Sequence, residues 1–169
     1  MIDPAQPQPG DLVFCHSKGI IGRAIRLGEW LRWRGGSHYN HVAILDEWQL
    51  TGWTVIQAEA RGVTRGALLS DVAPGGSYVI VSAPPDANRA DLLSFARAQV
   101  GTRYGFLTIA SLIVTILTPV FFNVMAPGSW ICSAVAAESI RCGGWIHNWP
   151  DVYQVTPAQL FLALSQPDA

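Results

Sequence analysis

SHYNHVAIL, residues 37–45, places His41 at the start of an apolar run that is typical of a β-strand. Far along the chain, SWICSAVA, residues 129–136, places Cys132 where a helix is expected to begin. A cysteine acts as a nucleophile in its thiolate form, which needs a base beside it and a positive local field. A histidine on a strand and a cysteine at a helix N-terminus supply both, provided that the fold brings them together.

The composition favours one domain with a large apolar core. The chain has 169 residues, of which 50% are hydrophobic and only 14% are charged. We expect a single domain over residues 1–169, with a proline-rich leader at residues 1–9. So apolar a composition indicates either a large core or a surface that meets lipid or a partner. The formal net charge of −1 gives no long-range attraction for nucleic acid, which we exclude as a partner.

The three cysteines, Cys15, Cys132 and Cys142, do not have the spacing of metal ligands. A disulfide framework and a zinc site are therefore not expected, and no cofactor or metal is predicted. The N-terminal residues lack the basic and apolar regions of a secretory signal. These features predict a cytoplasmic or membrane-associated protein.

The pattern of apolar residues and turn signals predicts an α+β domain, in which a small antiparallel sheet packs against helices. The expected strands cover residues 11–15, 41–48, 53–60, 77–82 and 152–155, and the second and third of them form a hairpin. The expected helices cover residues 20–33, 86–100, 129–142 and 156–164.

One apolar segment, from Gly105 to Ala126, stands out because no charged residue occurs between Tyr104 and Ala137. As a helix, its 22 residues would be about 33 Å long, enough to cross a bilayer. Pro119 inside the segment argues against a continuous helix. Two interpretations stay open: a buried hairpin or broken helix that covers the core, and a segment that docks on or crosses a membrane.

Cys132 is the preferred nucleophile. If Ser129 caps the helix, Cys132 lies in the first turn, where unpaired N–H groups and the helix dipole favour an anion. Such a position lowers the pKa of a thiol, and the backbone N–H of Cys132 can also donate to a developing oxyanion. The alternative is a cysteine that only packs in the core.

His41 is the preferred base. In a strand that begins at Asn40, its side chain shares a face with Ala43, whose small side chain leaves room for a partner. The alternative is a surface histidine that closes a loop. His38 competes for the role, but nothing nearby in the sequence is expected to hold its ring.

A catalytic histidine usually needs a third group that holds its tautomer and orientation. Glu59 is the best candidate, because it ends the strand that pairs with the histidine strand. Gln57, on the same face, and Asp46 are the reserves for this role. Cys15 and Cys142 are expected to be structural, and no phosphate-loop, zincin or serine-elbow motif is present in the sequence.

Four short motifs occur in one order along the chain: GDLVF at 10–14, NHVAI at 40–44, AEARGV at 58–63 and WICS at 130–133. Together they resemble the circularly permuted NlpC-type papain-like enzymes, and above all the YiiX-like amidases and peptidases. The lecithin retinol acyltransferase-like proteins are more distant relatives. The segment GTRYG at 101–105 also resembles the Gly-x-x-Tyr-Asp segment of this family, with glycine in place of aspartate. The resemblance covers residues 10–145.

The resemblance implies a papain-like core with Cys132 as nucleophile, His41 as base and Glu59 as the orienting residue. It also implies a thiol hydrolase that cleaves an amide through an acyl-enzyme, in a cell-wall peptide or in an acylated peptide or lipid. The alternatives are an acyltransferase with the same nucleophile and a non-catalytic, membrane-associated binding protein. The segment from Gly105 to Ala126 is longer and more apolar than the family pattern, so it bears on the substrate and on contact with lipid.

Overall fold

The computed structural model describes residues 6–16, 39–117, 128–145 and 152–165. Its centre is a five-stranded sheet in the order β4-β3-β2-β1-β5, and every neighbouring pair is antiparallel. The strands are β1 (Leu12–Cys15), β2 (His41–Gln49), β3 (Gly52–Glu59), β4 (Gly62–Leu68) and β5 (Tyr78–Val81). The predicted α+β class and the predicted hairpin of β2 and β3 are confirmed.

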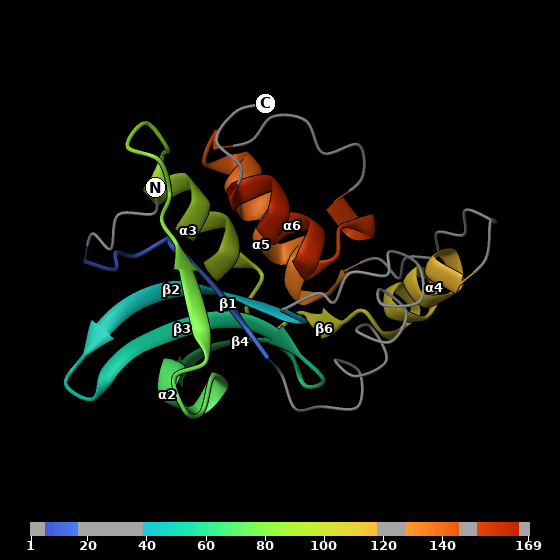
Figure 1. The fold of residues 1–169 in the computed structure, drawn as a ribbon, viewed down its shortest axis with the longest axis horizontal. Coiled ribbons are helices and arrows are strands. Elements are labelled where there is room, and N and C mark those ends of the chain that lie inside the picture. Colours follow the sequence, from blue (N-terminus) through green and yellow to red (C-terminus); the bar gives the residue numbers. More distant parts are fainter. Residues whose placement is uncertain (1–5, 17–38, 118–127, 146–151, 166–169) are drawn as a thin grey trace.

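Helices cover both faces of this sheet, as Figure 1 shows. α3 (Arg89–Ala98), α5 (Cys132–Cys142) and α6 (Pro157–Ser165) lie on one face, where α5 touches β2, β3 and both other helices. The short α2 (Leu69–Val72) lies on the other face, against β3 and β4. β6 (Arg103–Tyr104) and β7 (Ser129–Trp130) form a separate parallel pair, and α4 (Phe106–Leu117) extends beyond it.

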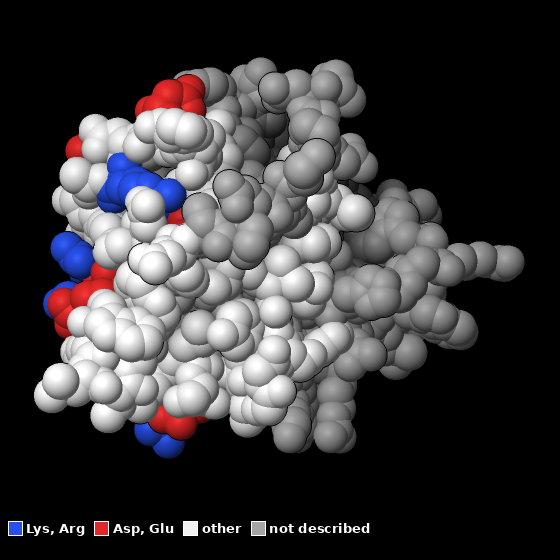
Figure 2. All heavy atoms as spheres, turned by 60° about the vertical axis from the view of Figure 1, so that its left-hand side comes forward, with Lys and Arg blue, Asp and Glu red and all other residues white. Residues whose placement is uncertain are grey.

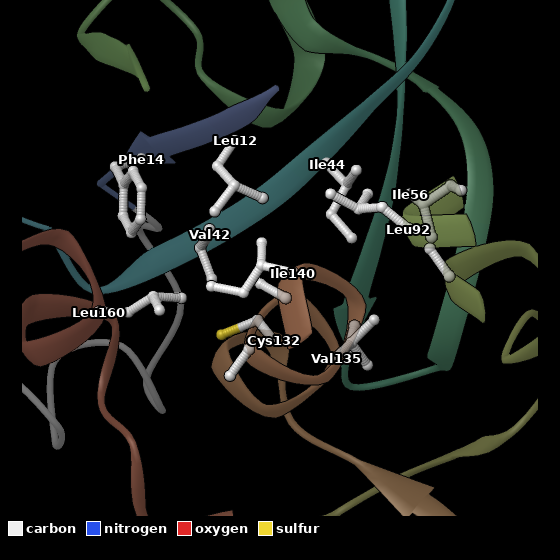
Figure 3. Close-up of a cluster of buried hydrophobic side chains, with 14 of the residues drawn as sticks. Leu12, Phe14, Val42, Ile44, Ile56, Leu92, Cys132, Val135, Ile140 and Leu160 are labelled. Atoms are coloured by element: carbon white, nitrogen blue, oxygen red, sulfur yellow. The ribbon is translucent and has the colours of Figure 1, made fainter. Parts of the chain in front are cut away.

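The alternation of side chains along β2 divides the core in two. Val42 and Ile44 point toward α5 and pack in the larger cluster with Ile140, as Figure 3 shows. Ala43 and Leu45 face the other way and pack in the smaller cluster beside α2. This is the division of faces that a strand starting at residue 41 predicts. The sheet is therefore buried on both sides around the start of β2.

Helix α3 begins two residues later than expected from a cap at Asp86. Asn88 is the N-cap, and its side chain accepts hydrogen bonds from the backbone N–H groups of Ala90 and Asp91. The correction has a simple cause, because a capping side chain must reach the N–H groups two and three residues ahead. Asp86 precedes that point and lies in the turn before the helix.

Helix α5 also starts later than expected, and Ser129 is not its cap. Ser129 and Trp130 pair as β7 with β6, so their backbone is extended rather than helical. The N-cap is Ile131, which has no side-chain hydrogen bond to the helix. As a result Cys132 is the first residue of the first turn of α5, where a cap at Ser129 would have made it the third; its predicted place in the first turn is confirmed.

The C-terminal part is predicted partly correctly. In place of the expected strand at 152–155 there is a 3-10 turn, η1 (Val152–Gln154). The last helix, α6, is confirmed with its predicted cap, since Thr156 Oγ1 accepts from the N–H of Gln159 and Gln159 Oε1 accepts from the N–H of Thr156. This reciprocal pair is a capping box. The helix expected at 20–33 lies outside the described residues.

Two buried aspartates at the sheet are paired with arginine side chains. Asp46 is buried and accepts from Arg65 and Arg97, and Asp11 is buried and accepts from Arg89. In Figure 2 the acidic and basic groups lie toward the rim of the view, while its centre carries no charge. Among the described residues, no helix is both long and apolar enough to cross a membrane.

Candidate active site

His41 is the first residue of β2 and is almost fully buried, with 9% of its surface exposed. It lies opposite Cys15 in the antiparallel pairing of β1 with β2. Its backbone pairs with β1 on one side, and β3 lies on the other side of β2, so the imidazole is carried by a central strand of the sheet. The preferred histidine of the sequence is therefore neither a loop residue nor a surface residue.

The imidazole is held from behind by Gln57 on β3. His41 Nε2 and Gln57 Oε1 are 2.8 Å apart, and both side chains are buried. An amide oxygen can only accept, so this contact places the hydrogen on Nε2 and leaves Nδ1 to face the other partner. The strand register explains the contact: Ile44 pairs with Ile56, and continuing that register sets residue 57 diagonally across from residue 41, on the same face.

Glu59 does not hold the histidine, which corrects the sequence-based expectation. It lies at the exposed end of β3, and its charge is the weakest of the influences that raise the pKa of His41. Asp46, the other alternative for the orienting role, forms ion pairs with Arg65 and Arg97 instead. Gln57 is thus the residue in the orienting position. Its uncharged amide suits a site so deeply buried, where a carboxylate would lose its hydration.

Cys132, at the start of α5, faces the histidine. It is 5% exposed, and its sulfur is hydrogen-bonded to the His41 side chain. The backbone N–H groups of Val42 and Ser133 also donate to this sulfur. Two segments far apart in the chain thus meet at one atom, since the helix start provides the Ser133 donor and the strand start provides Val42 and His41. In Figure 3 the sulfur lies at the N-terminal end of α5, next to Val42.

The electrostatics of the pair favour charge separation. Burial is the largest single influence on Cys132 and raises its pKa, but the hydrogen bond and charge of His41, with the two backbone N–H donors, outweigh it and lower the pKa. Burial likewise lowers the pKa of His41, but the hydrogen bond and charge of Cys132, together with Gln57, outweigh it and raise the pKa. A lowered thiol pKa beside a raised imidazole pKa favours a thiolate–imidazolium pair.

The other two cysteines are not activated in this way. Burial and the neighbouring Cys132 raise the pKa of Cys15 to about 12. Cys142 is exposed at the C-terminal end of α5, and partial burial of its thiol, together with the charge of Glu138, raises its pKa. Both are therefore harder to ionise than Cys132, and of the three cysteines only Cys132 combines a lowered pKa with a hydrogen bond to a base.

Tyr104 is a neighbour of the pair that was not predicted from the sequence. Burial and the negative charge of Cys132 raise the pKa of this phenol well above its ordinary value, so it stays protonated and able to donate. Its position follows from the parallel pairing of Tyr104 with Trp130, two residues before Cys132. The GTRYG segment was the available signal, but only the β6–β7 pairing brings it to the cysteine. The competing His38 lies outside the described residues.

No model of a known protein family matches the chain, and no curated protein sequence matches it. Its structure is similar to the crystal structure of metalloprotein yiiX from Escherichia coli O157:H7, with a TM-score of 0.57 and 20% sequence identity over 82% of this chain and 67% of that chain. At this identity the likeness shows the fold alone, a YiiX-like α+β fold. That protein is described as a metalloprotein; the described residues of this chain contain no group of three or more His, Cys, Asp or Glu that fits a metal.

Proposed function

We propose that the chain is a thiol hydrolase of the permuted papain-like kind, which cleaves an amide bond through Cys132. The observation that carries the proposal is the hydrogen bond between His41 and Cys132, with Gln57 bound to the far side of the imidazole. A nucleophile, a base and an orienting amide in that order are the parts that thiol hydrolysis needs. The YiiX-like fold and the order of histidine before cysteine support the permuted arrangement.

In the first half of the proposed reaction, the Cys132 thiolate attacks the amide carbonyl and forms a tetrahedral oxyanion. The backbone N–H of Cys132 is suited to donate to that oxyanion, because the first residue of a helix has no intrahelical acceptor for its N–H. The His41 imidazolium then gives its proton to the amine nitrogen as the C–N bond breaks. The amine leaves, and a thioester on Cys132 remains.

In the second half, neutral His41 takes a proton from water, and the resulting hydroxide attacks the thioester carbonyl. The C–S bond breaks, the acid is released, and the sulfur departs as a thiolate beside the imidazolium. Gln57 contributes by holding the Nε2–H, so that Nδ1 faces the sulfur and the water in both steps. The substrate classes we propose are those expected from the sequence, a cell-wall peptide or an acylated peptide or lipid.

The test is to trap and map the acyl-enzyme. The protein is incubated with a panel of fluorogenic peptidyl and acyl amides and with an electrophilic acyl probe, and the labelled residue is mapped by mass spectrometry. We expect the label on Cys132, and we expect Cys132→Ala and His41→Ala to be folded but without turnover. Cys142→Ala is the matched control and keeps full turnover, since that thiol lies at the opposite end of α5.

Retained turnover in purified Cys132→Ala protein would rule out the proposed mechanism. Product analysis with and without an added amine acceptor separates hydrolysis from acyl transfer. Free acid as the sole product in both supports a hydrolase, and an acylated amine as the main product contradicts it.

A further inference from the structure

Helix α4 turns apolar side chains toward the solvent. Its described buried side chains are Ile109 and two hydroxyl residues, Thr108 and Ser111, and the Thr108 hydroxyl has no hydrogen-bond partner in the structure. The exposed positions among its described side chains are all apolar: Phe106, Leu107, Ala110 and Val114. A surface helix of a soluble protein shows the opposite arrangement, with its polar face toward water. The described part of this helix thus has features of both interpretations of the segment, since Ile109 packs in a small core cluster with Ile131 and Ala134 while other apolar side chains point outward.

The exposed side chains form a stripe along the helix. Phe106, Ala110 and Val114 follow one another at intervals of four residues, and Leu107 flanks them. Phe106 and Leu107 are each more than half exposed. A contiguous apolar surface of this kind on a protein marks a site of contact with a partner or with lipid.

The charge around the helix indicates which of these it meets. No Lys, Arg, Asp or Glu occurs from residue 104 to residue 137, so the segment offers no group that would pair with a charged protein surface or an anionic lipid. The twelve residues of α4 make a helix about 18 Å long, well short of the roughly 30 Å hydrocarbon core of a bilayer. A helix this short can lie along the surface of a bilayer but cannot cross it. Without charged residues it gains nothing from anionic lipid, so its binding would come from buried apolar area on an electrically neutral bilayer.

Aromatic rings at the base of α4 fit the same setting. Tyr104 packs edge-on against Phe106, with ring centroids 5.0 Å apart, and half-buried Trp130 stacks on Tyr153 beside it. Tyrosine and tryptophan are the residues that concentrate at the boundary between lipid and water. The exposed stripe thus begins at Phe106, next to these partly buried Tyr and Trp side chains.

We propose that the outward face of α4, formed by Phe106, Leu107, Ala110 and Val114, docks this protein onto the surface of a zwitterionic lipid bilayer. The docking helix adjoins the candidate active site. Tyr104 contacts Phe106, and it lies close enough to Cys132 to interact electrostatically with the sulfur. Resting on the proposed function, this arrangement assigns the substrate to amides whose acyl chain is held in the bilayer. The dyad then meets the amide at the membrane surface.

The first experiment measures flotation of the full chain with phosphatidylcholine vesicles, for wild type, Leu107→Asp and Leu162→Asp. Leu162 on α6 is the matched control, since it is 57% exposed and Leu107 is 56% exposed. We expect wild type and Leu162→Asp to float, and Leu107→Asp to lose binding by about tenfold, because a charge does not enter the apolar layer. Binding should persist in high salt and should not need phosphatidylserine.

Failure of wild type to float, equal flotation of the two aspartate variants, or binding only to phosphatidylserine vesicles would each overturn the docking proposal. So would a wild-type dimer in sedimentation that Leu107→Asp abolishes while no protein floats, since a second copy would then cover α4. Circular dichroism checks that each variant is folded. The variant Ala110→Asp supplies a second site on the same stripe, and its loss of flotation is expected as well.

A second experiment separates this proposal from the proposed function. Cys132→Ala should float like wild type, because the thiol takes no part in docking. Leu107→Asp should hydrolyse a short, soluble acyl amide at the wild-type rate but a vesicle-borne long-chain amide at least about fivefold more slowly. Flotation without turnover on any amide would contradict the hydrolase and leave docking supported. Equal loss on both substrates would contradict the assignment of a bilayer-held substrate.

Discussion

The Nε2 atom of His41 lies 2.8 Å from the Oε1 atom of Gln57 on the neighbouring strand. This contact fixes the orientation of the imidazole, because an amide oxygen can only accept, so Nε2 carries the hydrogen and the opposite nitrogen is turned toward Cys132. Gln57 acts on the proposed chemistry through His41 and not by touching a substrate. It is therefore a positioning residue, and its effect should show in the pH dependence as well as in the rate.

Gln57→Ala should lower kcat by about 10- to 100-fold, since general base catalysis contributes about 10²–10⁴ and loses part of this when the ring is no longer held. The variant also removes an interaction that raises the pKa of His41. The imidazolium is the proton donor, so the alkaline limb of the activity profile should move to lower pH. Steady-state kinetics across pH check both effects.

Glu59→Gln is the matched control for that variant. Its charge attracts the imidazolium less strongly than the Gln57 hydrogen bond does, so we expect a smaller shift of the alkaline limb in the same direction and nearly unchanged kcat. A large loss in Glu59→Gln together with a wild-type profile in Gln57→Ala would show that the orienting residue is the glutamate after all.

The reactivity of Cys132 should follow a thiol pKa below the ordinary value of about 8.5. The alkylation rate rises with the thiolate fraction, so a lowered pKa moves its midpoint to lower pH. In His41→Ala the burial of the sulfur stays while the hydrogen bond and positive charge are lost, so the midpoint should move to higher pH. Iodoacetamide labelling, mapped residue by residue, measures it.

Cys142 is the internal reference in the same labelling experiment. It is exposed and its pKa is raised, so its midpoint should lie above that of Cys132. A common midpoint for the two cysteines, or a Cys132 midpoint that His41→Ala leaves in place, would mean that the histidine does not activate the thiol.

Gly62→Ala should destabilise the fold by more than about 2 kcal/mol, through both backbone strain and overlap. Gly62 has a φ of 113°, and an added Cβ would overlap the carbonyl oxygen of Thr102, which accepts from the N–H of Val63. Because Thr102 leads into β6, the substitution should also displace Tyr104 and reduce activity. Urea unfolding measures the stability.

Gly52→Ala separates the two causes. Its φ of 133° is equally unfavourable for alanine, but an added Cβ meets nothing within 4 Å. We expect a cost of about 1 kcal/mol there, from the backbone alone. Equal costs at the two glycines would mean that the close approach of β4 to Thr102 contributes nothing.

Ile140→Ala should destabilise the protein by about 2–5 kcal/mol, as buried aliphatic truncations do. Ile140 is fully buried where α5 packs on the sheet, so its loss leaves a cavity behind Val42. Leu50→Ala, at the fully exposed tip of the β2–β3 hairpin, is the control and should change stability by less than about 0.5 kcal/mol. Similar costs in thermal unfolding would contradict the assigned core.

Local patterns in the sequence correctly predicted those features that depend only on residues close together in the chain. The alternation after His41 predicts which residues of β2 face α5, since a strand turns its side chains to alternate faces. Thr156 as a cap, followed by Pro157 at the first helical position, predicts the start of α6, and the structure confirms it and adds a capping box with Gln159. The choice of His41 and Cys132 likewise came from their positions at element starts, and the structure brings the two together.

Long-range geometry decided the rest. Residues 57 and 59 share a face, so periodicity cannot separate Gln57 from Glu59, and only the register of β2 on β3 does so. The late start of α5 follows from pairing of β7 with the distant β6, which overrides the capping tendency of Ser129. The composition of α4 also cannot show that apolar side chains face outward, because which face of a helix is buried depends on the elements that pack against it. The sequence determined most of the elements around the site and the two reactive side chains, because these follow local rules, while the pairing and packing of distant segments decided the remaining elements and which groups meet.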